Sequence, residues 1–511
     1  CAAPGATPRP AVAMAFHIAS QIRPAYISAW LLLLGLVAGA APRAPGEAIA
    51  ADTVDESSIG LLQMGSVMRH EAAGRRAKAG AGEADAIWPS GRGRQGSYGW
   101  SRSHSAPFDL KLEWSWHHPR GRFHTLTYGT AVDGGGNVYL SAADAMRKFT
   151  PHGQLVWEYK TLPAEIPNAA ALWDGKVISS DTDGRVFAVD METGELLWST
   201  KVCDEIAQDN GFLTVHDEVV VAATDGHDGE NNRAVRGLDA SSGAPLWSFR
   251  PDAGVWNFMA SFPGDGTAAF QDQAGKAYSL RLRDGHLLWK EGGFDGSWTD
   301  GTAALGPSGV LYTVHNNRLE SEGGEADSQG TLCARNATTG ALLWNQTTPR
   351  PPNNAPVVGK VHSYPGLTVV HPIGQQLLQD GPTDVYAYDA DTGAERWVFR
   401  GPAQRGAMQA GDAEGASSRT LAGVRYFCMP NAWSAPTIDA NGTVFVGHQD
   451  GLFFALRDVN GDGVVEGPKE VSSFDTRAAF AGSAGPSLAP GRVVVTSCDS
   501  LFVFGDSRSG P

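Results

Sequence analysis

The sequence predicts an all-β protein, an eight-bladed β-propeller of four-stranded antiparallel blades. A tryptophan recurs at intervals of 41 to 55 residues between positions 157 and 397. Before each tryptophan lies a run that alternates apolar and polar residues, as a half-buried strand requires, and then a tight-turn segment. Four strands in a period of about 40–50 residues are typical of propeller blades. Seven blades is the alternative count.

The 511 residues divide into four expected parts. Residues 1–40 have the layout of a secretory signal peptide: Arg23, the apolar run 27–38, and the small residues 38–40 at a cleavage point. Met14 is an alternative start, and an uncleaved signal anchor is the alternative to cleavage. Residues 41–107, rich in Ala, Gly, Arg and Ser, are expected to form a mostly disordered linker. The propeller follows over 108–506, and 507–511 form a tail.

The clearest copy of the repeat runs from Gly184 to Trp198. In its Asp-x-x-Thr-Gly turn, Asp190 can accept backbone N–H bonds and Gly194 permits a positive φ. The next strand carries the tryptophan, which we expect to wedge between adjacent blades. The docking tryptophans predicted in this way are Trp157, Trp198, Trp247, Trp289, Trp344 and Trp397.

The last repeat, 492–504, has no tryptophan strand of its own. The strand 110–116, which contains Trp114, lies at the front of the domain and can complete this blade. We therefore expect the N-terminal strand to close the ring, which removes the sheet edges that would otherwise invite aggregation.

Charge and targeting limit the classes of partner. Lys and Arg number 40 against 55 Asp and Glu, a net charge of −15, which disfavours nucleic acid and anionic lipid as partners. With the signal peptide, this predicts a secreted, lumenal or periplasmic protein with no integral membrane domain after cleavage. Three sequons, at Asn336, Asn345 and Asn441, are glycosylation sites if the chain enters a eukaryotic secretory route.

Four cysteines lie in the propeller region: Cys203, Cys333, Cys428 and Cys498. Their spacings are too wide for a zinc site. An oxidising compartment permits disulfides, and free buried thiols are the alternative.

The Ala-x-Asp-x-x-Thr-Gly-x-x-x-Trp motif at 188–198 and 387–397 resembles the tryptophan-docking repeat of the pyrroloquinoline quinone (PQQ) propeller superfamily, the quinoprotein alcohol dehydrogenase-like proteins. The resemblance covers nearly all of 108–506 and implies the fold. The resemblance is a weak guide to the activity of this chain, because the superfamily has members with different functions. They include quinoprotein dehydrogenases, a bacterial outer-membrane assembly lipoprotein that binds partners without a cofactor, and lumenal sensor domains.

The enzymes of this superfamily place PQQ against a disulfide between adjacent cysteines, with a calcium ion and an aspartate base beside it. This sequence has no Cys-Cys pair, and no motif matches the calcium ligands or the base, so we assign no catalytic residue. Trp256, Trp298 and Trp433 lie outside the docking positions and are candidates for the lining of a central funnel, with blade packing as the alternative.

One segment, Asp458-Val-Asn460-Gly-Asp462-Gly-Val464-Val-Glu466, resembles the first half of an EF-hand calcium loop. Alternate oxygens converge on one hard cation in such loops, and Val464 contributes its carbonyl. The twelfth position is Lys469 rather than Glu, and Glu470 comes one residue late. We expect a structural calcium site here, with a metal-free turn as the alternative.

The longest inter-strand segments are 225–233, 316–330, 371–382 and 401–430. In the expected topology all four lie on one face of the ring, and loops on a rigid scaffold often carry function. The sequence therefore favours a non-catalytic scaffold that binds a protein or small-molecule ligand on this face. A PQQ-dependent dehydrogenase for an alcohol or sugar, and a lumenal sensor domain, are the alternatives.

Overall fold

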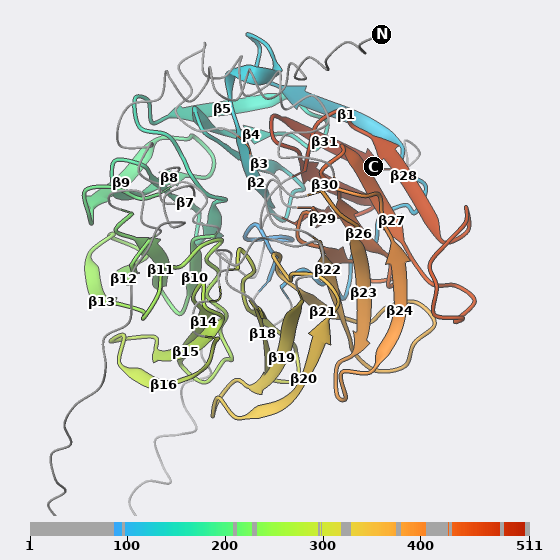
Figure 1. Cartoon of the computed structure of the whole chain (residues 1–511). Coiled ribbons are helices and arrows are strands. Elements are labelled where there is room, and N and C mark those ends of the chain that lie inside the picture. The colour runs from blue at the N-terminus through green and yellow to red at the C-terminus, as the bar shows by residue number, and fades with distance from the viewer. Residues whose placement is uncertain are drawn as a thin grey trace, which may run out of the picture. The chain divides into compact units, whose positions relative to one another are not determined.

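The computed structural model describes residues 86–94, 98–207, 212–226, 232–294, 297, 299–317, 329–374, 380–404, 428, 432–480 and 485–505. They belong to one compact unit, Gly80–Pro511. Their strands form eight antiparallel sheets that follow one another around a ring (Figure 1). The predicted eight-bladed propeller is confirmed, and the count of seven is wrong.

Each blade except blade 4 is a meander of four strands whose first strand lies innermost (Figure 1). Blade 1 comprises β2 (Thr127–Val132), β3 (Val138–Ala142), β4 (Ala145–Phe149) and β5 (Leu155–Lys160); blade 2 comprises β6 (Ala171–Trp173), β7 (Lys176–Asp181), β8 (Arg185–Asp190) and β9 (Leu196–Lys201). Blade 3 comprises β10 (Thr214–His216), β11 (Val219–Thr224), β12 (Ala234–Asp239) and β13 (Pro245–Phe249); blade 4 comprises β14 (Thr267–Gln271), β15 (Lys276–Arg281) and β16 (Leu287–Gly292). Blade 5 comprises β17 (Ala304–Leu305), β18 (Val310–Asn316), β19 (Gly330–Asn336) and β20 (Leu342–Thr348); blade 6 comprises β21 (Val357–Gly359), β22 (Thr368–Ile373), β23 (Asp384–Asp389) and β24 (Glu395–Arg400). Blade 7 comprises β25 (Thr437–Ile438), β26 (Val444–Gly447), β27 (Leu452–Leu456) and β28 (Val471–Asp475); blade 8 comprises β29 (Ser487–Ala489), β30 (Arg492–Thr496), β31 (Ser500–Gly505) and β1 (Leu112–His117). In blade 4 a single bridge between Ser261 and Ala269 takes the place of the innermost strand.

The ring closes as predicted. Strand β1 pairs antiparallel with β31, with Trp116 opposite Leu501. The first described strand thereby supplies the outermost strand of the last blade. A short 3-10 helix, η1 (Arg122–His124), connects β1 to blade 1.

Indole side chains join neighbouring blades by one repeated contact. Trp247 Nε1 donates a hydrogen bond of 2.7 Å to the carbonyl of Leu282 in the turn of the next blade. Its ring packs on Gly285, where a Cβ would come within 2.7 Å of the indole, so the turn requires glycine. The same donor contact is made by Trp114 to Pro151, Trp157 to Met191, Trp198 to Ala240, Trp289 to Thr338 and Trp344 to Ala390.

Residues 86–94 and 98–107, here called the axial segment, pack inside the ring instead of forming part of a linker. Trp88 pairs with Val132 of blade 1, and Trp100 pairs with Ile438 of blade 7. Both indoles are buried, and the segment is drawn in blue near the middle of the ring in Figure 1. The propeller unit therefore begins before residue 108, and the linker expected over 41–107 is too long at its C-terminal end.

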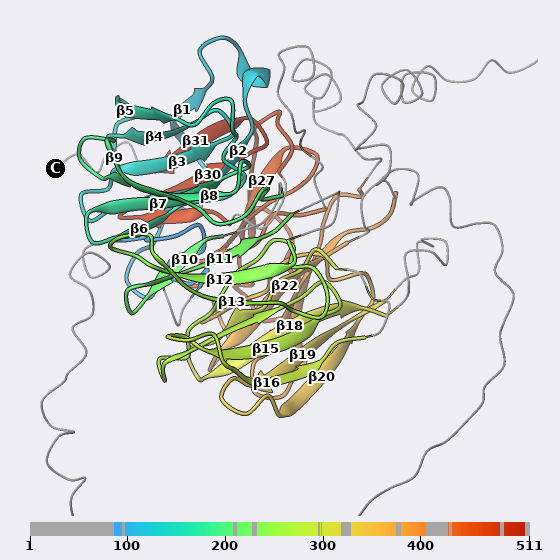
Figure 2. The same ribbon diagram turned by 90° about the vertical axis from the view of Figure 1, so that its left-hand side faces the viewer.

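The two faces of the ring carry different connections. The turn face has the short connections between first and second strands and between third and fourth strands. The loop face has the connections between second and third strands and those between blades, which include 225–233, 317–329, 374–383 and 401–436. Figure 2 shows the blades from the side, with the outer strands β9 and β13 toward the viewer.

Candidate functional site

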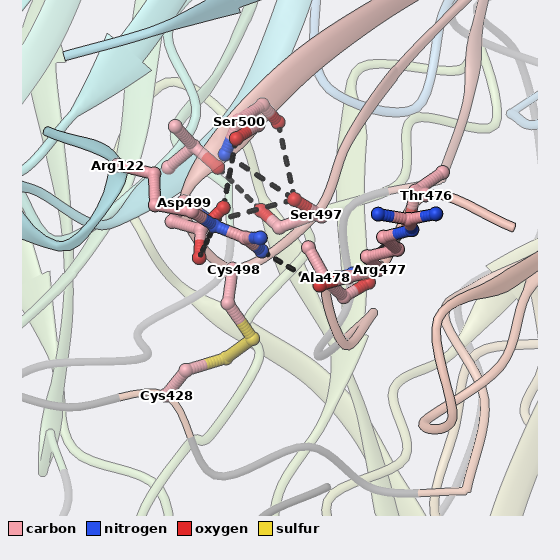
Figure 3. Close-up of a disulfide and its surroundings, with 10 residues drawn as sticks. Arg122, Cys428, Thr476, Arg477, Ala478, Ser497, Cys498, Asp499 and Ser500 are labelled. Carbon is pink, nitrogen blue, oxygen red and sulfur yellow. Dashed lines mark hydrogen bonds and ion pairs between the residues drawn. A yellow bond between two sulfur atoms is a disulfide. The ribbon is translucent and has the colours of Figure 1, made fainter. Parts of the chain in front are cut away.

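A disulfide between Cys428 and Cys498 anchors the longest connection on the loop face (Figure 3). Cys428 belongs to the connection between blades 6 and 7, and Cys498 to the turn between β30 and β31 of blade 8. Their Cα atoms are 5.8 Å apart. Of the cysteines whose pairing the sequence left open, these two form a disulfide, whereas Cys203 and Cys333 are free.

An ion pair lies beside the disulfide. Arg122 of η1 donates through Nε to Asp499 Oδ2 at 3.2 Å, and through Nη2 to the carbonyl of Arg477 at 2.8 Å (Figure 3). Asp499 is buried at the turn that carries Cys498. We call Arg122, Cys428, Arg477, Cys498 and Asp499 the loop-face anchor, because they lie in four connections of this face and tie them together. The sequence identified the two cysteines as candidates for a disulfide, but no repeat motif marks Arg122, Arg477 or Asp499.

A second charged network lies under the loop face of blade 1. The guanidinium of Arg147 contacts Asp144 and lies 2.7 Å from Glu158 Oε2. Burial alone would raise the pKa of Asp144. The hydrogen bonds and charge of Arg147, together with the Thr125 hydroxyl and His118, hold that pKa below its ordinary value. The carboxylate therefore stays ionised and fixes the β3–β4 turn.

Three polar side chains near the ring axis each donate a hydrogen bond to the following connection between blades. Asn257 Nδ2 donates to the carbonyl of Asp300 at 2.8 Å, and Thr299 Oγ1 donates to the carbonyl of Pro352 at 3.0 Å. Asn354 Nδ2 donates likewise to the carbonyl of Trp433. These bonds join blades 4 to 7 in sequence and form a polar collar at the loop-face end of the axis.

The axial segment crosses the ring below this collar. The carbonyl of Pro89 accepts from Leu172 N of blade 2 at 2.7 Å, and Arg92 Nη2 donates to the carbonyl of Pro356, next to β21 of blade 6, at 3.1 Å. Blades 2 and 6 are opposite one another in an eight-membered ring. Tyr98 packs with Ala169, Phe212 and Met259 of blades 2 to 4. The axis is therefore filled by the chain itself at this level. This segment was not predicted from the sequence. The signal that could have revealed it is the presence of Trp88, Tyr98 and Trp100, because aromatic residues are unusual in a disordered linker.

Of the three tryptophans expected at a funnel, the structure describes Trp256 and Trp433. Trp433 is buried among Phe399, Phe454 and His448 in the core between blades 6 and 7. Trp256 is half-buried before blade 4, and Trp298 lies outside the described residues.

The loop expected to bind calcium forms one parallel β-bridge with the outer strand of blade 6, between Val464 and Val398. Val398 N donates to the Gly463 carbonyl, and Val465 N donates to the Val398 carbonyl, each at 3.0 Å. Both carboxylate oxygens of Asp458 accept backbone N–H groups of the loop itself, from Gly461 and Gly463.

The other predicted ligands of this loop point along it or outward. Asn460 donates to Asp462 at 2.8 Å, and Asp462 accepts from Val464 N at 2.9 Å. Glu466 is exposed, and its N–H donates to the buried Glu470. Over the described part of the chain, no three His, Cys, Asp or Glu side chains gather as a metal-binding group. Calcium stays a prediction.

The three sequon asparagines lie on two blades. Asn345 on β20 and Asn441 in the β25–β26 turn are exposed. Asn336 is half-buried, and its Oδ1 accepts the turn N–H groups of Thr338 and Thr339. Glycosylation of these residues stays a prediction.

A family model described as outer membrane protein assembly factor BamB matches residues 94–293 and 294–423, more than half of the chain. The chain belongs to this family. Membership in the PQQ-like propeller superfamily, predicted from the docking motif, is confirmed by this match.

The proteins to which this BamB-family chain is similar include dehydrogenases as well as BamB itself. The dehydrogenase subunit of the quinone alcohol dehydrogenase of Gluconobacter oxydans (strain 621H) is 27% identical over 274 residues, which are 47% of this chain and 34% of that subunit. BamB from Moraxella catarrhalis has a TM-score of 0.53 at 14% identity, covering 79% of this chain and 99% of that one. Quinohemoprotein alcohol dehydrogenase ADHIIG from Pseudomonas putida HK5 has a TM-score of 0.55 at 12% identity, covering 84% and 81%. The chain spans about a third of the length of its Gluconobacter relative, and the two structural likenesses concern the fold alone. In the segments whose structure is described, no helix has the length and apolar character needed to span a membrane.

Proposed function

We propose that this chain is a non-catalytic, extracytoplasmic propeller that binds a partner through its loop face. The observation that carries the proposal is the axial segment. It runs between the innermost strands of opposite blades, so residues of the chain itself occupy the ring axis. A propeller filled at its axis presents its faces and rim for binding.

The superfamily implies PQQ, a flat cofactor that needs a chamber with converging polar groups. The axis, as far as the structure describes it, does not fit this group. The polar side chains of the collar bond neighbouring blade connections, as Asn257 and Thr299 do. The disulfide joins Cys428 to Cys498, 70 positions apart, and not two adjacent cysteines. We derive no catalytic step through PQQ.

The loop-face anchor supports the choice of face and of compartment. The disulfide holds the connection between blades 6 and 7 against blade 8, and the Arg122–Asp499 pair holds the connection from β1 to blade 1 against the same β30–β31 turn. Disulfides persist in oxidising compartments, which agrees with the signal peptide read from residues 1–40. Loops held on a rigid scaffold are suited to recognition.

A photo-cross-linking experiment tests the face. Ala403 is exposed on the loop face and Asn441 is exposed on the turn face, so each can carry a photo-reactive residue without disturbing the core. In the native compartment, we expect a discrete cross-linked product from position 403 and none from position 441. Products from position 441 alone would overturn the assignment of the face.

The dehydrogenase remains the second candidate, because the Gluconobacter relative is a quinone alcohol dehydrogenase subunit. Reconstitution with PQQ and calcium, followed by dye reduction with alcohols and sugars, separates the two. If the chain is a non-catalytic scaffold, we expect no saturable PQQ binding and no dye reduction. Stoichiometric PQQ binding with turnover would replace it by the dehydrogenase.

A further inference from the structure

Arg92 is a fully buried arginine at the centre of the axial segment. Its Nη2 donates to the Pro356 carbonyl at 3.1 Å, and its own backbone carbonyl accepts from Gly99 N at 2.6 Å. The guanidinium nitrogens Nε and Nη1 have no hydrogen-bond partner. One carbonyl is thus the sole hydrogen-bond acceptor of this guanidinium among the described residues.

The other fully buried arginine, Arg147, has a different environment. Its guanidinium contacts Asp144 and Glu158, two carboxylates that balance its charge. No ion pair of the described residues includes Arg92, although an unpaired buried charge costs several kcal/mol. Burial lowers the pKa of Arg92 to about 9, which still leaves the group cationic at neutral pH.

The space around Arg92 limits what can balance it. Its neighbour Gly91 packs so closely that a Cβ would come within 2.3 Å of Phe212 and 2.8 Å of Ala169. Gly99 packs on the guanidinium itself, where a Cβ would come within 3.0 Å of Nη2. A bulky organic acid would force these contacts apart, whereas a monatomic anion requires the smallest displacement and carries the single negative charge needed.

We propose that Arg92 holds a small monovalent anion, of the size of chloride, through Nε and Nη1 between the axial segment and the ring. N–H groups of a cationic donor form the stronger class of hydrogen bond. The bound anion neutralises the buried guanidinium and locks the axial segment in the axis. This site is independent of the partner proposed for the loop face.

The test compares the melting temperature of the purified full chain in sodium chloride and in sodium gluconate at equal ionic strength. Chloride should raise it by roughly 2–4 °C relative to gluconate, since a ligand that binds only the folded state stabilises it. The variant Arg92→Met should lose this difference. The control Arg283→Met removes an equal charge from an exposed position and should keep it.

Two thermal results would overturn the proposal: no chloride effect in the wild type, or an equal chloride effect in Arg92→Met. If Arg92→Met does not fold, crystals of the wild type grown in sodium bromide give the answer. An anomalous peak within hydrogen-bond distance of Arg92 Nε or Nη1 is expected. A clear map without that peak would contradict the site.

Discussion

At the scale of single residues, the docking indoles differ in one respect. Trp247 donates to the Leu282 carbonyl of the next blade, whereas Trp397 Nε1 has no hydrogen-bond partner among the residues that the structure describes. The reason is that blade 7 has no Asp-x-x-Thr-Gly turn to offer a carbonyl, since the loop after β27 takes its place. The motif alone predicted equal roles for these tryptophans, because it does not reveal what the following blade presents.

Substitution by phenylalanine should expose this difference. Trp247→Phe keeps most of the buried ring but leaves the Leu282 carbonyl without its donor, which should cost about 1–3 kcal/mol of unfolding free energy. Trp397→Phe removes no hydrogen bond and should cost less. Denaturant unfolding of both variants measures the difference, and equal losses would show that the hydrogen bond contributes little to docking.

The Asp144 carboxylate makes stability depend on pH. Its pKa in the folded state is held below the ordinary carboxyl value of about 4. The group therefore adds stability that is fully present above that value and is lost as the pH falls through the folded pKa. Asp144→Asn should lower stability at pH 7 by about 1–3 kcal/mol and flatten the decline between about pH 5 and 3.

Denaturant unfolding across that pH range measures the effect. Glu192→Gln is the matched control, because Glu192 pairs with Lys148 but its side chain is 81% exposed. An unchanged acid profile in Asp144→Asn would assign the acid sensitivity to other carboxylates.

At the scale of elements, the loop from Asp458 to Glu470 covers the edge of β24. The Asp-x-Asn-x-Asp-Gly pattern of this loop is visible in the sequence. The pairing of the loop with blade 6 could not be predicted, because it depends on long-range contacts that no local pattern encodes. The Tyr364 hydroxyl, from the first turn of blade 6, donates to Asp458 Oδ2 at 2.6 Å. The loop thereby fastens blade 7 to blade 6 where the indole of Trp397 forms no hydrogen bond.

Removal of the Asp458 carboxylate should weaken this connection. Asp458→Ala leaves the N–H groups of Gly461 and Gly463 without their acceptor, at a cost of about 1–3 kcal/mol, while the Tyr364 hydroxyl keeps the Arg396 carbonyl as its acceptor. Denaturant unfolding measures it. A loss below about 0.5 kcal/mol, the range of ordinary surface substitutions, would contradict the role of this residue.

Calcium is tested separately on the same loop. If Asp458, Asn460 and Asp462 bind it, calcium at roughly 1 mM, the upper end of the dissociation constants of extracellular modules, should raise the melting temperature over an EDTA control. Asp462→Ala should abolish the rise, because it removes an exposed candidate ligand. A rise of equal size in Asp462→Ala would place the ion elsewhere.

At the scale of the whole molecule, the ring was predictable and its axis was not. The spacing of Trp157 to Trp397 and the strand around Trp114 sufficed for eight blades closed by an N-terminal strand, because each blade repeats one local pattern. The axial segment has no repeat, and its partners lie in blades far along the chain. The loop-face disulfide could not be predicted for a similar reason, because the spacing of Cys428 and Cys498 in the sequence does not determine their pairing.

Filling of the axis by the chain itself is the claim on which the proposed function depends. Hydrogen–deuterium exchange of the full chain, resolved by mass spectrometry, measures it directly. The N–H groups of Trp88 and Ser101 donate to Val132 and Ile438 of the inner strands, so these two N–H groups should exchange as slowly as those of β2 and β25. Complete exchange of both groups within seconds, while β2 and β25 stay protected, would mean an open axis and would contradict the proposal.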